Sequence, residues 1–317
     1  MIHTMHLPDG FLAPQLALAL WVATAAIVGF ALRRLSASSD EASAAQRPIL
    51  MGIVGAFIFA AQLFNFPVAA GTSGHLLGGV LAGYLLGPWA GTIVMTTVIG
   101  IQALIFQDGG LLALGANIFN MGIIGTLGGA LVARSIATAL GGSRVATIAA
   151  AGVAGWLSVM AGAGVTTLQL GLSGTTDVSI GLPAMLGIHA LIGIGEGLIT
   201  IAALTFIATT APDLLTLGAP TRASATRRIL VGSGISLLVA ALAALFASAD
   251  PDGLQRVALT LGFHTAANTP PFELFPGYTI PGIDSATGTL LIAVVGVGII
   301  FTAILLLSRI AARRGRQ

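Results

Sequence analysis

Apolar runs long enough to cross a lipid bilayer follow one another along almost the whole chain. A bilayer core requires about 20 mostly apolar residues from a spanning helix, and turn or charged residues separate the runs here. Charged residues make up only 8% of the chain, against roughly 25% in an average soluble protein, so a soluble fold could not cover its surface. The sequence therefore predicts an all-α polytopic protein of the cytoplasmic membrane. Its nine runs are 10–32, 49–66, 76–87, 88–106, 110–133, 144–168, 181–208, 229–248 and 287–308.

The third run is too short to span a bilayer alone if Gly87 and Pro88 form a turn. A half helix and a helix that continues past Pro88 are both compatible with the sequence. Glycines also recur at four-residue steps, which places them on one helix face and predicts close packing of backbones. These glycines are Gly79, Gly83, Gly87 and Gly91, then Gly125 and Gly129, and Gly193 and Gly197.

All 13 basic residues are arginines, and they fall in alternate connections between the runs. Basic residues gather on the cytoplasmic side of membrane proteins. If the N-terminus is outside, only Arg256 is external, whereas most of the acidic residues are external. We therefore expect an external N-terminus and a cytoplasmic C-terminus. The twelve arginines on the cytoplasmic side are Arg33, Arg34, Arg47, Arg134, Arg144, Arg222, Arg227, Arg228, Arg309, Arg313, Arg314 and Arg316.

A connection rich in proline and arginine, at about 209–228, is the best internal boundary. Residues 1–210 are predicted to form a membrane core of about seven helices. Residues 211–228 are predicted to be a cytoplasmic linker. Residues 229–317 are predicted to form a two-helix segment with an external loop at 249–286.

Cysteine and lysine are absent from the sequence. Their absence excludes disulfides, thiolate metal sites and a standard ATP-binding loop, which needs a lysine on the phosphates. Energy from ATP would have to come from another subunit. Imidazole is then the main side chain available for late transition metals. The five histidines are His3, His6, His75, His189 and His264, of which only His189 is expected within the membrane.

His6 directly follows Met5, and this order suits a chelate. A free amine on Met5, the amide nitrogen of His6 and its imidazole could place three nitrogens in a plane around one metal ion. His75 is the natural fourth donor, and tetragonal nitrogen coordination suits Ni(II) or Cu(II), with related geometry for Co(II). Spacing alone favours a solvated loop residue for each external histidine over a metal ligand.

Four blocks resemble the CbiM/NikM family, the substrate-binding S components of energy-coupling-factor importers of cobalt and nickel. The blocks begin at Met5-His6-Leu7-Pro8-Asp9-Gly10-Phe11-Leu12, Gly71-Thr72-Ser73-Gly74-His75, Gly115-Ala116-Asn117-Ile118-Phe119-Asn120 and His189-Ala190-Leu191-Ile192-Gly193-Ile194-Gly195-Glu196. Together they cover about residues 5–210. Pro251-Asp252-Gly253-Leu254 resembles the fused PDGLE/NikN-type segment, but Gln255 replaces its glutamate, which weakens any role for that carboxylate.

This resemblance implies that Met5, His6 and His75 bind the metal, and that Asn117 and Asn120 shape the pocket. Hydrogen bonding between helices is the alternative role for the two asparagines. The resemblance also implies that the protein transports Co(II) or Ni(II). It implies no permanently bound cofactor and no nucleic acid as a partner. The expected partners are membrane lipid, a scaffold subunit similar to CbiQ/NikQ and an ATPase subunit similar to CbiO/NikO. The chain itself would not be an enzyme.

His189 and Glu196 are seven residues apart, which brings them to nearly the same helix face. Glu196 could lock two helices together or couple the S component to its partner, and both residues are expected outside the metal shell. The alternative function is a gradient-driven secondary transporter that uses Glu196. An intramembrane metallohydrolase is disfavoured, because the sequence has no His-Glu-x-x-His motif.

The start of the mature chain matters, because Met5 is internal in the numbered sequence. We expect translation to start at Met5, or residues 1–4 to be removed. Alternatively, Met1, Ile2 and His3 could supply four planar nitrogens without His75. The residues do not choose between cobalt and nickel, although the fused segment resembles the nickel-type arrangement.

Overall fold

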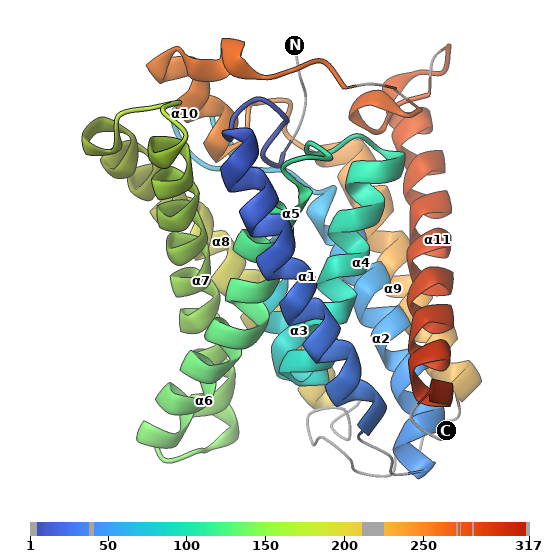
Figure 1. The fold of residues 1–317 in the computed structure, drawn as a ribbon. Helices are drawn as coiled ribbons and strands as arrows, with labels where there is room; N and C mark the ends of the chain where they lie inside the picture. The colour runs from blue at the N-terminus through green and yellow to red at the C-terminus, as the bar shows by residue number, and fades with distance from the viewer. Residues whose placement is uncertain are drawn as a thin grey trace.

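The chain folds into a bundle of helices that run roughly parallel to one axis (Figure 1). The computed structural model describes residues 5–37, 41–210, 225–270, 272, 274–280 and 282–314. The long helices are α1 (Pro14–Ala37), α2 (Glu41–Gln62), α4 (Pro88–Ile105), α7 (Arg144–Leu172), α8 (Val178–Thr210), α9 (Ala225–Phe246) and α11 (Ser285–Arg314). Shorter elements are β1 (Phe66–Pro67), β2 (Ser73–Gly74), α3 (Gly79–Leu86), α5 (Leu114–Asn117), a π-helical segment (Ile118–Gly129), α6 (Ala130–Ala139) and α10 (Gly253–Leu261).

Within the described ranges, seven helices are long and apolar enough to cross a membrane, which confirms a multi-pass helical membrane protein. Six of them are α1, α4, α7, α8, α9 and α11, and the seventh is the continuous helix Leu114–Ala139. The other two predicted runs are α2, which contains the shorter apolar helix Arg47–Gln62, and α3. The start of α1 and the end of α11 lie at opposite ends of the bundle (Figure 1). Which end faces the cytoplasm stays a prediction.

The third run is a half helix, one of the two forms that the sequence allowed. Helix α3 ends at Leu86, and the next residue, Gly87, has a φ of 80° and a ψ of 160°, which suit glycine and break the helix. Pro88 then begins α4 at a position where its missing N–H costs no helical hydrogen bond. The rest of this run, from Leu76 to Gly78, is not helical and connects α3 to the hairpin formed by β1 and β2.

The recurring glycines lie at close approaches between backbones. A Cβ atom on Gly79 would be 2.9 Å from the Cα atom of Gly125, and one on Gly197 would be 2.9 Å from the carbonyl oxygen of Gly152. Side chains larger than hydrogen would therefore force these helices apart. Two of them differ: Gly129 faces the side chain of Val80, and nothing lies within 4 Å of a Cβ added to Gly87, whose role is the turn.

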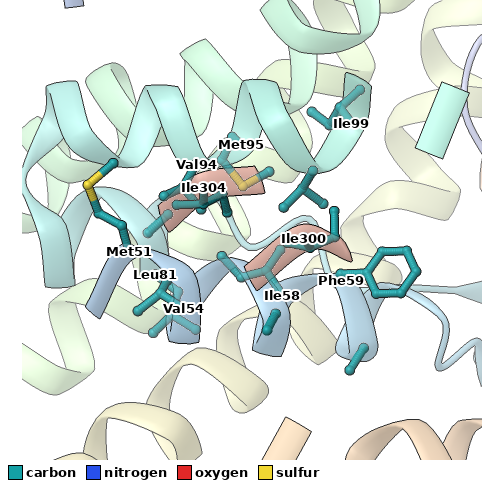
Figure 2. Close-up of a cluster of buried hydrophobic side chains, with 14 of the residues drawn as sticks. Met51, Val54, Ile58, Phe59, Leu81, Val94, Met95, Ile99, Ile300 and Ile304 are labelled. Atoms are coloured by element: carbon teal, nitrogen blue, oxygen red, sulfur yellow. The ribbon is translucent and has the colours of Figure 1, made fainter. Parts of the chain in front are cut away.

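The two C-terminal helices share one hydrophobic core with the rest of the bundle. Figure 2 shows Ile300 and Ile304 of α11 among side chains of α2 and α4. Gly55 of α2 lies against Ile304, and Gly232 of α9 lies against Ile53 of α2. Helices α9 and α11 are thus packed along the core that the earlier helices form. Most of the predicted linker at 211–228, namely residues 211–224, lies outside the described residues.

Three segments lie together at one end of the bundle and form what we call the cap. They are the segment before α1, the β1–β2 hairpin and the connection between α9 and α11. Helix α10 lies at the same end as the start of α1 (Figure 1). The Ser73 amide donates to the Pro251 carbonyl over 2.9 Å, and the Asn268 amide donates to the Asp9 carbonyl over 2.7 Å. The connection between α9 and α11 is therefore bonded to both the N-terminal segment and the β1–β2 hairpin.

Candidate metal pocket

The segment that precedes α1 is buried inside the cap. Leu7, Phe11 and Leu12 are all buried, and the Asn117 side chain pairs with the backbone of Leu7. The Leu7 amide donates to Asn117 Oδ1, and Asn117 Nδ2 donates to the Leu7 carbonyl, each over 3.0 Å. Because one amide side chain satisfies both backbone groups, the adjoining residue His6 is held in a fixed position.

Asp108 holds the residues on the other side of Leu7. The Met5 nitrogen donates to Asp108 Oδ1 over 2.7 Å. Nδ1 of His6 lies 3.1 Å from the Asp108 carbonyl oxygen and 3.8 Å from its carboxylate. His6 is 2% exposed, and its Nε2 has no hydrogen-bond partner in the described part of the chain. Nδ1 is the imidazole nitrogen that could close a chelate ring with the His6 amide nitrogen, whereas the unpartnered Nε2 points away from that ring.

His75 reaches the same place from the β1–β2 hairpin. Its ring centroid lies 5.8 Å from that of His6, at an interplanar angle of 65°. Burial lowers the pKa of His75, and repulsion from His6 lowers it further. The imidazole is therefore neutral at physiological pH, which is the form that binds metals.

Glu196 of α8 fixes the irregular segment that follows His75. Its two carboxylate oxygens accept hydrogen bonds from the Leu77 amide, over 2.6 Å, and the Gly78 amide, over 3.0 Å. Both partners of Glu196 are backbone amides of the segment that precedes α3. Glu196 does not line the pocket described next.

A cavity of about 80 Å³ lies between these elements and brings several predicted site residues together. The residues that line it include Met5, His6, His75, Asn117, Asn120, Thr166, His189 and Asp252. Asn120, on the π-helical segment, also bonds to Gln169 of α7 over 2.7 and 2.8 Å. It therefore both joins two helices and faces the pocket. In the described residues, no group of three or more His, Asp or Glu side chains could hold a metal ion.

His189 lies in the wall of the pocket, with Nδ1 2.7 Å from the Met185 carbonyl oxygen, and its expected place outside the metal shell stays a prediction. His264 is exposed in a short 3₁₀ helix and does not line the pocket. His3 lies outside the described residues.

The turn Pro251-Asp252-Gly253-Leu254, called the PDGL turn below, forms one wall of the pocket. The sequence alone did not indicate this contact. Asp252, Gly253 and Leu254 all line it. Asp252 caps α10 by accepting a hydrogen bond from the Gln255 amide over 2.7 Å. An aspartate followed three residues later by glutamine or glutamate is typical of a helix start, so Gln255 suits this position as well as glutamate does. The motif was visible in the sequence, but its contact with the pocket was not.

Fold and pocket together define a multi-pass membrane protein with a buried site of imidazoles and backbone nitrogens. Residues 6–214 match the CbiM family, described as the cobalt uptake substrate-specific transmembrane region, and residues 226–313 match the PDGLE domain. The chain belongs to the CbiM family, which confirms the resemblance seen in the motifs.

Individual relatives agree with this assignment. The chain is 37% identical to a putative fused nickel transport protein, NikMN, of Archaeoglobus fulgidus, over 97% of this chain and 99% of that protein. It is 40% identical to a putative metal transport protein of Haloquadratum walsbyi, over 67% of this chain and 93% of that protein. A crystal structure of a transition metal transporter is 31% identical and superposes with a TM-score of 0.55, covering 64% of this chain and 92% of that one.

Proposed function

We propose that this chain is the metal-capture subunit of an importer of Ni(II) or Co(II), with Met5, His6 and His75 as ligands. One observation carries the proposal: the rings of His6 and His75 lie 5.8 Å apart in a buried cavity that Met5 also lines. Two imidazoles together with backbone nitrogens make a nitrogen-rich set that suits Ni(II), and Co(II) accepts the same donors. Such a set needs no third metal-binding side chain.

The charges around the cavity support a divalent cation as cargo. A dication in a buried pocket needs nearby negative charge, because desolvation of an unpaired ion is costly. The Asp108 carboxylate lies beside Met5 and His6, and Asp252 lines the cavity from the opposite segment. Neither residue was assigned to the site from the sequence.

The choice between the two metals rests on the fused segment. A relative that spans nearly the whole chain is named a nickel transport protein, whereas the family description names cobalt uptake. We therefore take Ni(II) as the first cargo and Co(II) as its competitor.

The energy source in this proposal is a separate ATP-hydrolysing subunit, joined through a membrane scaffold subunit as in energy-coupling-factor importers. The chain has no lysine for a standard ATP-binding loop. The gradient-driven alternative needs a free ionisable group within the membrane, and Glu196 is its candidate. Both carboxylate oxygens of Glu196 already accept backbone hydrogen bonds, and this favours a structural role.

Metal binding by the purified chain tests the ligand set. His6→Ala and His75→Ala are each expected to abolish high-affinity binding of Ni(II) and Co(II). His264→Ala is the matched control, because this histidine is exposed and away from the cavity. Uptake of each ion by cells that express the chain with its partner subunits would decide between the metals. Unchanged uptake by His75→Ala at limiting metal would contradict the assignment.

A further inference from the structure

A second contact joins the C-terminal segment to the metal pocket, at a distance from the PDGL turn. The Tyr278 hydroxyl donates to Asp108 Oδ2 over 2.7 Å. The other oxygen of the same carboxylate, Oδ1, accepts from the Met5 nitrogen over 2.7 Å. One buried carboxylate therefore bridges the connection between α9 and α11 to the N-terminal segment.

The ring of Tyr278 is fixed by aromatic neighbours. It stacks on Phe106, with ring centroids 5.1 Å apart and an interplanar angle of 26°. Phe59 packs against both rings, with its centroid 6.4 Å from that of Tyr278. Tyr278 is 6% exposed. Because the ring cannot shift freely, the hydroxyl oxygen has a defined position over Asp108.

The Tyr278 hydroxyl is the donor in this contact. Burial raises the pKa of Tyr278 well above its usual value, and the neighbouring Asp108 raises it further. A protonated phenol facing a carboxylate forms a charge-assisted hydrogen bond, which is stronger and more directional than a neutral one.

Asp108 has little freedom once these bonds are made. Its amide donates to the Gln102 carbonyl over 3.0 Å, and its own carbonyl faces His6 Nδ1. The backbone is therefore held, and the remaining freedom is rotation of the carboxylate. Tyr278 removes that freedom by taking one oxygen, which leaves the other aimed at the Met5 nitrogen.

We propose that Tyr278 is a positioning residue of the metal site: through Asp108 it orients the Met5 nitrogen toward the position of the metal. This inference rests on the proposed function, in which that nitrogen is a ligand. The C-terminal segment then tunes metal affinity without touching the metal.

The test is Ni(II) binding in detergent by the chain that begins at Met5, in which the Met5 nitrogen is an amine, measured by titration calorimetry. Tyr278→Phe keeps the aromatic stacking and removes one hydroxyl, and we expect it to raise the Kd about tenfold, as for loss of one hydrogen bond to a charged group. The matched control is Tyr84→Phe, because Tyr84 is the other tyrosine in the chain and does not line the pocket. Its Kd is expected to equal that of the unaltered chain.

A double-mutant cycle separates positioning from a general effect on the fold. If Tyr278 acts through Asp108, then Tyr278→Phe causes no further loss in an Asp108→Asn background. The ligand-field absorption band of bound Ni(II) is expected to shift in both single variants and to stay in place in Tyr84→Phe. Replacement of Tyr278 by p-aminophenylalanine, which keeps an N–H donor, is expected to restore the affinity and the band.

The outcomes distinguish this inference from the proposed function. If the unaltered chain binds neither Ni(II) nor Co(II), the proposed function fails. If it binds Ni(II) and Tyr278→Phe binds equally well, or if the two losses add, only the positioning role is overturned. If Tyr278→Phe does not fold, two other variants decide the question. The chain with p-aminophenylalanine at position 278 must bind Ni(II) as tightly as the unaltered chain does. The Asp108→Asn variant must bind Ni(II) more weakly.

Discussion

The backbone of Gly253 lies directly against the ring of His189. A Cβ atom at position 253 would be 2.8 Å from His189 Cε1 and 2.7 Å from the Cδ1 atom of Ile192. A side chain there would force His189 and Ile192 to shift, or α10 to move away from α8. This contact explains why glycine follows aspartate in the PDGL turn, and it makes the turn the point where the C-terminal segment docks on the pocket.

The first prediction is that Gly253→Ala opens this contact. Overpacking of a filled site typically costs about 1–3 kcal/mol, so we expect a lower unfolding temperature and weaker Ni(II) binding. Tryptophan fluorescence in a thermal scan and calorimetry would measure the two effects. Gly298→Ala in α11 is the control, because nothing lies within 4 Å of a Cβ atom added there. Equal stability and affinity in both variants would show that the turn does not need glycine.

The second prediction concerns Glu196. Glu196→Gln replaces one carboxylate oxygen by an NH₂ group that would face a backbone N–H, so it loses one of the two bonds to Leu77 and Gly78. We expect a loss of about 2 kcal/mol in the free energy of unfolding. Ni(II) affinity should also fall, because these two bonds hold the segment that immediately follows His75. Thermal unfolding and calorimetry measure both quantities.

Thr200→Val is the control for Glu196. Thr200 lies one turn further along α8 and is fully buried, and its hydroxyl has no hydrogen-bond partner in the described part of the chain. The gradient-driven alternative predicts a different pattern. In that case Glu196→Gln would leave metal binding intact and stop uptake, and a protonophore would stop uptake while ATP is maintained.

The third prediction is a pH dependence set by Asp252. Burial raises the pKa of Asp252 to about 7, from an ordinary value of 3.8. The folded state therefore binds more protons than the unfolded state between these values. In metal-free protein, this contribution to stability is present below about pH 4 and is lost as the pH rises through about 7, by at most about 1.4 kcal/mol per pH unit.

Asp252→Asn isolates this effect, because asparagine also caps helices but carries no titrating proton. The unfolding temperature of the unaltered chain, relative to that of the variant, should fall between about pH 5 and pH 8. Tryptophan fluorescence at a series of pH values, in the presence of a metal chelator, measures the difference. Parallel curves for the two proteins would contradict a raised pKa at Asp252.

Features that depend on local sequence were predictable, and the contacts between distant segments were not. The apolar runs located the helices because bilayer thickness fixes their length, and Gly87-Pro88 marked the break before α4. Histidine chemistry and the family motifs selected His6 and His75, which the structure brings together. By contrast, no periodicity or spacing places Tyr278 on Asp108, because that contact depends on how the loop between α9 and α11 folds over the cap.

His189 and Asp252 show the same limit. Periodicity put His189 on the face of Glu196, but a helix face is broad, and α8 presents these residues to different neighbours two turns apart. Asp252 was noticed only as part of a motif of the fused segment. Its place on the cavity follows from the docking of α10 on α8 through Gly253, a contact between residues far apart in the chain.

The last prediction concerns where the functional chain begins. The proposed chelate uses a free amine on the residue before His6, but in the numbered sequence the Met5 nitrogen belongs to an amide. An amine at Met5 could keep its bond to Asp108 Oδ1 through one hydrogen while its lone pair binds the metal. We therefore expect the intact mass of the protein isolated from its native membrane to lack residues 1–4. In that chain His6→Ala and His75→Ala should both abolish high-affinity binding. The competing arrangement uses Met1, Ile2 and His3, which lie outside the described residues. It predicts a retained Met1 and loss of binding in His3→Ala alone, and that pair of results would overturn the assignment of Met5.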